Sequence, residues 1–416
     1  MNTLTTLTQL GLIATLMAMG ISSVREFRNH TPGRFRKVAS GLGSILAGLG
    51  NVAGLMVPFF AFFMASLSLI AVIIHARVMR STRSSVRPWT LGVAALLALA
   101  VALLQPLGLK VLLLPKADDL PTRAMQTRVL KTFEPGESLE GIAVGAQGQI
   151  VLTTNKGLRL DSSDYYQAAE GTLLQWSPTG ETRTLLKTPQ GTTAGVPVVR
   201  HDGTIFMTSH GKQSVVWRLA LNQKPEVLAK FPEDAWPNGL DLGPDGQLYS
   251  PDSHLGIVWK IDPNTGRIEK AFEGDELRAR PWIALAPGAN GLHFQGQSMF
   301  VTVSDRTTLL EFTMNAQGQL GKPRVLAKGI PGDDFAIDAQ GNVYVTTHPY
   351  NTLVKVTPTG ERTIVGGEAQ SLLGPTAAAF GQTLQDANTL YVVTDGGAFQ
   401  GNPQAKGQLI AVNTQP

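Results

Sequence analysis

Four side chains with oxygen donors recur at one position of a repeated pattern. Glu140, Asn238 and Asp333 each stand eight residues before a glycine, and Asn290 takes the equivalent position in a copy with a shorter turn. Two carboxylates and two amide oxygens, without histidine or cysteine, form a hard-oxygen set that suits a divalent cation such as Ca²⁺. Each residue alone is typical of an ordinary turn, but their common register predicts a metal site.

Short strands must position these residues. From residue 127 onward, six copies of a unit with two alternating apolar runs and a turn follow one another, and each continues with a third strand. Five copies have a fourth, outer strand, and RVLKTF (Arg128–Phe133) would supply the missing one to the sixth copy. The turn glycines of the first five copies are Gly148, Gly203, Gly246, Gly296 and Gly341.

This repeat predicts an all-β six-bladed propeller over residues 127–416, with a β-sandwich as the alternative. In a propeller the inner strands surround a central axis, so their first residues converge at one mouth. Glu140, Asn238, Asn290 and Asp333 would then meet around one point.

Residues 1–117 have the composition of an α-helical transmembrane region. Residues 7–24 are apolar over a length that could span a bilayer, residues 38–74 are nearly continuous in apolar and small residues, and residues 90–114 form a further candidate. A cleaved signal peptide is disfavoured, because a basic segment before the first run and a small-residue cleavage site are both missing. Residues 118–126 are a polar linker.

The basic loops 25–37 and 77–87 bear on the number of spans. If residues 38–74 form a hairpin of two helices that turns near Pro58, both loops face the cytoplasm, in accord with the positive-inside tendency. This favours four spans, a multi-pass protein of the cell membrane and a propeller on the extracytoplasmic side. The alternative is three spans with one long, tilted helix.

Charge separates the two parts of the chain. Residues 1–117 contain eleven Lys and Arg and one acid, Glu26, whereas the remainder contains 24 basic and 30 acidic residues. The acidic propeller argues against nucleic-acid binding. The chain has no cysteine, so it has neither disulfides nor thiolate metal sites. Serine-nucleophile elbows, P-loops and zinc-protease motifs are also missing.

Several motifs resemble the senescence-marker-protein/gluconolactonase/luciferin-regenerating-enzyme-like family, which includes regucalcin. They are WPNGLDLGPDGQLY, GANGLHFQGQSMFVT, DDFAIDAQGNVYVTTHPYNTLVKVTPTG and GPTAAAF…TLYVVTDGG. The resemblance covers about residues 127–416 and implies a six-bladed propeller with one central divalent metal, usually calcium. It also implies a lactone hydrolase that acts on a small-molecule substrate.

The resemblance assigns roles to individual residues. Glu140, Asn290 and Asp333 match the family's metal ligands, Asp333 also matches the proposed catalytic base, and Asn238 matches a pocket residue. Sugar lactonases of the family carry an arginine where this chain has Trp236, which indicates a more apolar substrate. The metal would act on a lactone or ester carbonyl, and Asp333 would orient or deprotonate the attacking water.

Two functions follow from this reading. The first is a membrane-tethered, metal-dependent hydrolase of lactones or related esters. The second is a non-catalytic ligand-binding or sensing propeller with a structural calcium.

Asp334 is expected to be a solvated loop acid. The loops after the second strands should rim the same mouth, and their histidines are expected at the surface. These loops carry His210, Asp252, His254, Asp305, His348 and Asp395.

Overall fold

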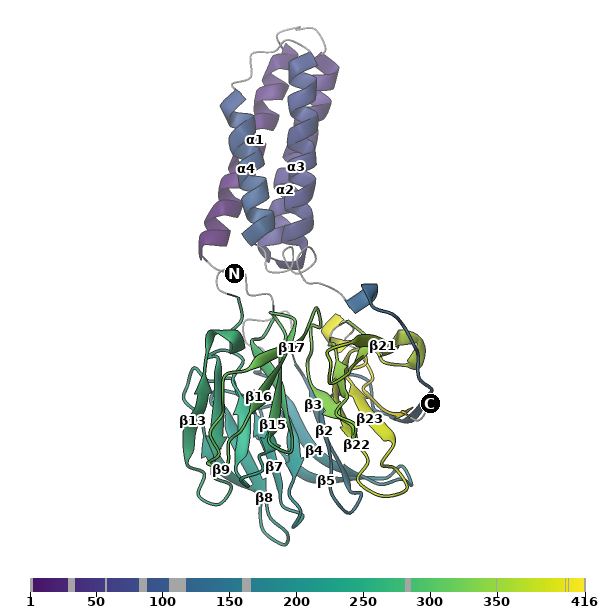
Figure 1. Ribbon diagram of the computed structural model, residues 1–416. Coiled ribbons are helices and arrows are strands. Elements are labelled where there is room, and N and C mark those ends of the chain that lie inside the picture. The colour runs from purple at the N-terminus through teal and green to yellow at the C-terminus, as the bar shows by residue number, and fades with distance from the viewer. Residues whose placement is uncertain are drawn as a thin grey trace. The chain divides into compact units, whose positions relative to one another are not determined.

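The computed structural model describes residues 3–28, 34–56, 58–81, 88–104, 117–158, 166–280, 286–348, 350–400, 402 and 404–414 (Figure 1). The chain divides into two compact units, Met1–Leu114 and Pro115–Pro416. The first unit contains α-helices, and the second contains β-strands with short 3₁₀ turns.

The apolar runs of the first unit form four helices: α1 (Thr3–Arg28), α2 (Arg34–Met56), α3 (Pro58–Ser81) and α4 (Pro88–Leu104). Each helix packs on the next in chain order, and α4 also packs on α1. The break between α2 and α3 falls at Pro58, where the sequence predicted a turn between helices. Proline is tolerated at a first helical position because the N–H that it lacks has no partner within the helix.

The transmembrane region expected in residues 1–117 is not supported. Within the described residues, none of these helices combines the length and the apolar character that crossing a bilayer requires. Polar groups lie between the helices instead. Asn51 Nδ2 donates a hydrogen bond to Ser68 Oγ at 2.7 Å, and Ser40 Oγ lies 3.1 Å from His75 Nδ1.

The second unit is a six-bladed propeller of four-stranded antiparallel sheets. Blade 1 contains β2 (Ser138–Val144), β3 (Ile150–Lys156), β4 (Glu170–Trp176) and β5 (Thr182–Lys187). Blade 2 contains β6 (Pro197–Val199), β7 (Ile205–Ser209), β8 (Val215–Leu219) and β9 (Glu226–Lys230). Blade 3 contains β10 (Asp241–Leu242), β11 (Leu248–Pro251), β12 (Ile257–Ile261) and β13 (Ile268–Glu273).

The remaining blades repeat this order from the axis outward. Blade 4 contains β14 (Ala289–Gln295), β15 (Ser298–Val303), β16 (Thr308–Thr313) and β17 (Arg324–Lys328). Blade 5 contains β18 (Phe335–Ile337), β19 (Val343–Thr346), β20 (Leu353–Val356) and β21 (Arg362–Gly366). Blade 6 contains β22 (Pro375–Phe380), β23 (Thr389–Thr394), β24 (Gln408–Asn413) and, from the start of the propeller, β1 (Thr127–Thr132).

Tight turns join the first and second strands of the blades. The turn glycines adopt left-handed conformations, for example Gly148 at φ 78° and Gly341 at φ 82°. A side chain would strain the backbone there, and glycine removes that strain. The six blades predicted from the repeat are therefore confirmed, and so is the position of their inner turns.

Strand β1 closes the ring. It pairs antiparallel with β24 as the outer strand of blade 6, as predicted for Arg128–Phe133. Packing across the closure joins apolar side chains of blade 1, such as Leu139 and Leu152, with Val393 and Leu409 of blade 6. Strand β24 therefore has a hydrogen-bonded partner on both sides, and blades 1 and 6 pack against each other to close the ring.

Threonine hydroxyls bind the start of several inner strands from the neighbouring blade. Their acceptors are backbone carbonyl oxygens close to the axis, so these bonds fix the height at which the axial residues stand. Thr153 binds Gly195 at 2.7 Å, Thr208 binds Asn238 at 3.1 Å, Thr346 binds Thr376 at 2.9 Å, and Thr376 binds Leu139 at 3.2 Å.

Residues 118–126, expected to be a linker, run beside blade 5. Thr122 bridges Ile364 of β21 in parallel, Arg123 N donates to Ile364 O at 2.8 Å, and Met125 N donates to Val365 O at 2.7 Å. Ala117 is buried in the core around blades 4 and 5. This segment is therefore part of the propeller unit.

Candidate functional site

The first residues of the inner strands line one small cavity on the propeller axis. It is narrow, and no water-sized sphere fits inside it in this structure. The four predicted axial residues, Glu140, Asn238, Asn290 and Asp333, all contribute to its wall. The other lining residues are Val196, Gly239, Gly291, Asp334 and Thr376. Trp236 is not among the described residues that line this cavity, but it precedes Asn238 by two positions.

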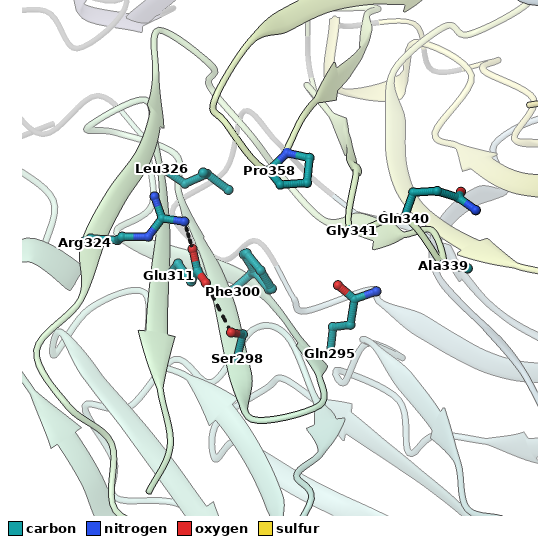
Figure 2. A pocket seen from close by; sticks show the side chains of 10 residues that line it. All are labelled: Gln295, Ser298, Phe300, Glu311, Arg324, Leu326, Ala339, Gln340, Gly341 and Pro358. Carbon is teal, nitrogen blue, oxygen red and sulfur yellow. Dashed lines mark hydrogen bonds and ion pairs between the residues drawn. The ribbon is translucent and has the colours of Figure 1, made fainter.

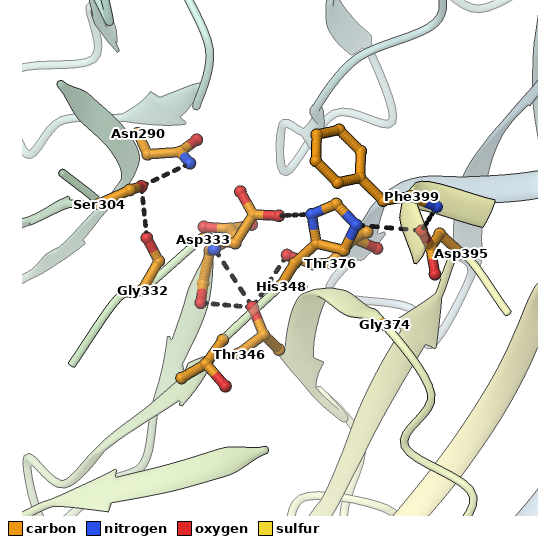
Figure 3. Close-up of polar contacts among 12 residues, drawn as sticks. Asn290, Ser304, Gly332, Asp333, Thr346, His348, Gly374, Thr376, Asp395 and Phe399 are labelled. Atoms are coloured by element: carbon orange, nitrogen blue, oxygen red, sulfur yellow. Dashed lines mark hydrogen bonds and ion pairs between the residues drawn. The ribbon is translucent and has the colours of Figure 1, made fainter. Parts of the chain in front are cut away.

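A hydrogen-bond chain fixes the amide of Asn290 (Figure 3). Asn290 Nδ2 donates to Ser304 Oγ at 2.9 Å, and Ser304 Oγ donates to Gly332 O at 2.6 Å. Asn290 is only 6% exposed. Because the nitrogen is committed to Ser304, the carbonyl oxygen is the donor atom that Asn290 can offer to a cation.

A histidine lies between two carboxylates at the same mouth (Figure 3). His348 Nδ1 is 3.5 Å from Asp333 Oδ2, and His348 Nε2 is 3.0 Å from Asp395 Oδ2. Asp395 also accepts backbone N–H bonds from Gly397 and Phe399, both at 2.7 Å. The ring of Phe399 covers the imidazole edge-on at 4.8 Å. Asp395 therefore fixes the orientation in which His348 faces Asp333.

The expectation for Asp334 is wrong, because this residue is only 4% exposed. Its Oδ1 lies 3.0 Å from His293 Nε2, and His293 Nδ1 lies 3.4 Å from Asp241 Oδ2. Asp334 Oδ2 is buried without a hydrogen-bond partner among the described residues. Burial lowers the pKa of His293, but the charges of Asp334 and Asp241 outweigh it and raise this pKa to about 10.

The axial carboxyls hold their protons more tightly than ordinary acids do. Burial raises the pKa of Glu140 to about 7, with repulsion from Asp395 and Asp334 acting in the same direction. Burial likewise raises the pKa of Asp333 well above its ordinary value, and the charge of Glu140 adds to the effect. For His348, the hydrogen bond to Asp395 and the charge of Asp333 outweigh burial and raise the pKa to about 9.

Residues 164–396 match the family model of the SMP-30/gluconolactonase/LRE-like region. The chain belongs to this family. The match begins after Glu140, so the place of Glu140 in the site rests on the axial geometry. No curated protein gives a significant match to the chain.

Two solved structures are similar to this family member. A gluconolactonase from Xanthomonas campestris is 16% identical, with a TM-score of 0.50 over 73% of this chain and 92% of that one. The calcium-binding protein regucalcin from Agrobacterium tumefaciens is also 16% identical, with a TM-score of 0.49 over 71% of this chain and 97% of that one. At such identities the likeness concerns the fold alone.

The residues of the axial cavity fit a divalent cation in charge and in donor chemistry. One small space is surrounded by the carboxylates of Glu140 and Asp333, whose pKa values are raised, and by the amide of Asn290. Asp334, whose Oδ2 has no hydrogen-bond partner among the described residues, also lines it. A cation there would offset both the burial and the repulsion that raise these pKa values. Among the described residues, no three His, Cys, Asp or Glu side chains are disposed as a metal-binding group. The candidate set has two carboxylates, Glu140 and Asp333, with the amide of Asn290 as its third donor.

Two other predicted rim acids serve the loop structure of this SMP-30-like propeller. Asp252 accepts hydrogen bonds from three backbone N–H groups and from the Trp259 indole. Asp305 accepts bonds from Arg280 and from the backbone N–H of Ala286. His210 and His348 are not ordinary surface histidines: His210 is 8% exposed, and the side chain of His348 is 15% exposed. His254 is exposed, as expected.

A second cavity lies at the inner turns of blades 4 and 5, outside the axial site (Figure 2). It has a volume of about 340 Å³. Its charged side chains, Glu311 and Arg324, pair with each other, and Ser298 Oγ donates to Glu311 at 3.1 Å. None of the predicted site residues lines it. Its charges are already satisfied, so it offers no free acid, base or metal donor.

Proposed function

We propose that the propeller is a metal-dependent hydrolase of lactones or related esters. The observation that carries this proposal is the axial cavity, where Glu140, Asn290 and Asp333 lie together with Asn238. Membership of the SMP-30/gluconolactonase/LRE-like family supports it. The name gluconolactonase, which the Xanthomonas campestris protein of the same fold bears, agrees with this reaction.

The cation would be held by Glu140, Asn290 and Asp333. Because all three offer oxygen donors, Ca²⁺ is the best match. Bound there, a divalent cation supplies Lewis acidity to a carbonyl oxygen. Asp334 would add negative charge behind this set, since its free Oδ2 faces no other partner among the described residues. Asn238, on the blade 3 side, would hydrogen-bond the substrate.

Asp333 is proposed to orient the attacking water and to take its proton. One of its oxygens, Oδ2, faces His348, which Asp395 fixes from the other side. In lactone hydrolysis, water adds to the carbonyl carbon and the ring C–O bond breaks. The ring oxygen takes up a proton, so the product is a single hydroxy acid. The proton that Asp333 removes from water would balance the one that the ring oxygen receives.

Hydrolysis of a lactone panel by the purified protein, with Ca²⁺ or with a chelator, tests the proposal. We expect turnover that requires the metal and that falls by about 100-fold or more in Asp333→Asn when metal is saturating, the range for loss of a general base. Calcium binding without turnover of any lactone or ester would instead favour the ligand-binding propeller with a structural calcium.

We also propose that the helical unit attaches the protein to the cell membrane. Several of its described apolar side chains point outward, and Leu46, Leu96 and Ile70 are 67%, 68% and 52% exposed. A large exposed apolar surface of this kind needs a covering partner, and lipid chains would provide it. Such attachment does not require a membrane-crossing helix, and none of the described helices is long and apolar enough to be one. Multi-pass insertion with the propeller outside the cytoplasm is a prediction from the sequence alone. Recovery of the full-length protein in the soluble fraction, or activity of a C-terminal reporter that works only in the cytoplasm, would contradict it.

A further inference from the structure

The two sides of the axial mouth differ in chemistry. The acids and the histidine of the candidate reaction lie on blades 1, 5 and 6: Glu140, Asp333, Asp334, His348 and Asp395. Blades 2 and 3 contribute Val196 and Asn238 to the cavity wall. A substrate whose carbonyl faces the acids would therefore extend the rest of its structure over blades 2 and 3.

Trp236 lies on this second side, two residues before Asn238, which lines the cavity. Three rings surround its indole. His210 stacks on it with ring centres 5.2 Å apart and planes inclined by 20°, His254 lies at 5.4 Å, and Tyr166 lies at 5.7 Å. Backbone bonds fix its segment, because Ser253 N donates to Trp236 O at 2.9 Å and Trp236 N donates to Asp252 Oδ1 at 3.2 Å. The indole is thus a supported, partly open aromatic surface.

The His210 side of this aromatic surface carries no charge at physiological pH. Burial lowers the pKa of His210 to about 4, so its imidazole carries no charge. Its Nδ1 lies 3.3 Å from Ser214 Oγ. Asp252, the buried acid beneath Trp236, already accepts four N–H hydrogen bonds. The acids nearest in the same segment, Glu233 and Asp234, are exposed to water.

We propose that Trp236, supported by His210, Tyr166 and His254, selects lactones or esters with an apolar or aromatic substituent over polyhydroxylated sugar lactones. This inference rests on the proposed hydrolase function and names its substrate class. An apolar substituent gains by leaving water against the indole face. Hydroxyl groups placed against the indole face would lose hydrogen bonds to water that the face of a ring cannot replace.

Turnover by the full-length protein tests the selection. The substrates are δ-valerolactone, a phenyl-substituted δ-valerolactone and glucono-δ-lactone, at saturating Ca²⁺. We expect kcat/KM to be highest for the phenyl derivative. Trp236→Ala should lower that value by about tenfold or more, the effect of losing part of an apolar pocket, and should change the unsubstituted lactone much less. Trp236→Phe should restore most of the loss.

The matched control is Trp217→Phe, because Trp217 lies in the third strand of blade 2 and not at the mouth. This variant should behave like the wild type on all three substrates. A preference for glucono-δ-lactone, or an equal loss on all three substrates in Trp236→Ala, would overturn the inference.

A binding experiment separates this inference from the proposed reaction. Phenyl-substituted δ-valerolactam keeps the ring and its substituent but resists hydrolysis, and calorimetry measures its affinity. If no lactone or ester is turned over, but the lactam binds and Trp236→Ala weakens it by about tenfold, the hydrolase proposal fails and the aromatic selection stands. If lactones are hydrolysed but the lactam binds wild type and Trp236→Ala equally, the aromatic selection fails alone.

Discussion

Calcium affinity should depend on pH through Glu140. Burial raises the pKa of this carboxyl to about 7, and only the ionised form can bind a cation. The carboxyl is about nine-tenths protonated at pH 6 and about one-tenth protonated at pH 8, so affinity should increase about tenfold between these values. Any proton that Asp333 holds in this range increases the effect. His348, with a pKa of about 9, stays mostly protonated throughout and changes the comparison little.

Isothermal titration at pH 6 and pH 8 measures this effect, and buffers of different ionisation enthalpy count the protons released on binding. Glu140→Gln should bind Ca²⁺ more weakly, and it should lose the roughly tenfold increase in affinity between pH 6 and pH 8 that Glu140 causes. The matched control is Glu137→Gln, because Glu137 pairs with Lys156 at 3.4 Å and does not line the axial cavity. Equal wild-type affinities at the two pH values, without proton release, would refute the reasoning about Glu140.

Three further predictions follow from the same structure. Ser304→Ala removes the acceptor that fixes Asn290 Nδ2 and should weaken Ca²⁺ binding about tenfold; Ser298→Ala, at the first residue of β15 and bound to Glu311, should not, and equal losses in a calcium titration would contradict the role of Ser304. A propeller beginning at Leu139 lacks β1 and should melt about 5–10 °C below one beginning at Met125, since it loses the pairing and apolar packing of an outer strand; identical melting curves would speak against closure by β1. In metal-free protein, the raised pKa of Glu140 favours the folded state at low pH. This contribution is lost as pH rises from about 4.5 to 7. The free energy of unfolding of wild type, measured relative to Glu140→Gln by denaturant titration, should therefore fall by about 3 kcal/mol over this range. A difference that stays constant with pH would contradict the raised pKa of Glu140.

The sequence contained enough information to predict the propeller and the register of its axis. The turn glycines mark each inner hairpin, and counting back from them identified residues that the structure brings into one cavity. The closing strand could be predicted because the sixth copy lacked an outer strand and RVLKTF stood before the first. These signals are local and repeat at regular intervals, so each copy supports the assignment of strands and turns in the others.

The pairing of His348 could not be predicted in the same way. Its position after β19 put it at the mouth, but its burial depends on Phe399 and its orientation on Asp395, about fifty residues further along the chain and in the next blade. Both partners lie in an irregular loop, where no periodicity relates them to His348. One signal was available in the sequence. His348 follows the second strand of its blade by two residues, and several acids are predicted near the axis, so an ion pair between His348 and an acid could have been predicted.

Asp334 failed as a prediction for a different reason. Two adjacent carboxylates at a strand entrance look alike in sequence, yet successive side chains of an extended segment point in different directions. Asp333 faces His348, whereas Asp334 reaches His293 on the neighbouring blade 4. Two turn-like acids therefore become one mouth residue and one buried residue. Only the three-dimensional arrangement of the blades distinguishes them.

The pairing of charges sets Glu140 apart from the other acids at the axis. Asp334 shares His293 with Asp241, and Asp333 shares His348 with Asp395. No Lys, Arg or His forms an ion pair with Glu140 among the described residues, although His348 is close enough to lower its pKa in part. The two histidines thus offset part of the charge of the four acids on blades 3, 5 and 6, whereas Glu140 has no such partner among the described residues. A divalent cation beside Glu140 would offset two further negative charges of the axis, so loss of that cation should favour protonation of Glu140.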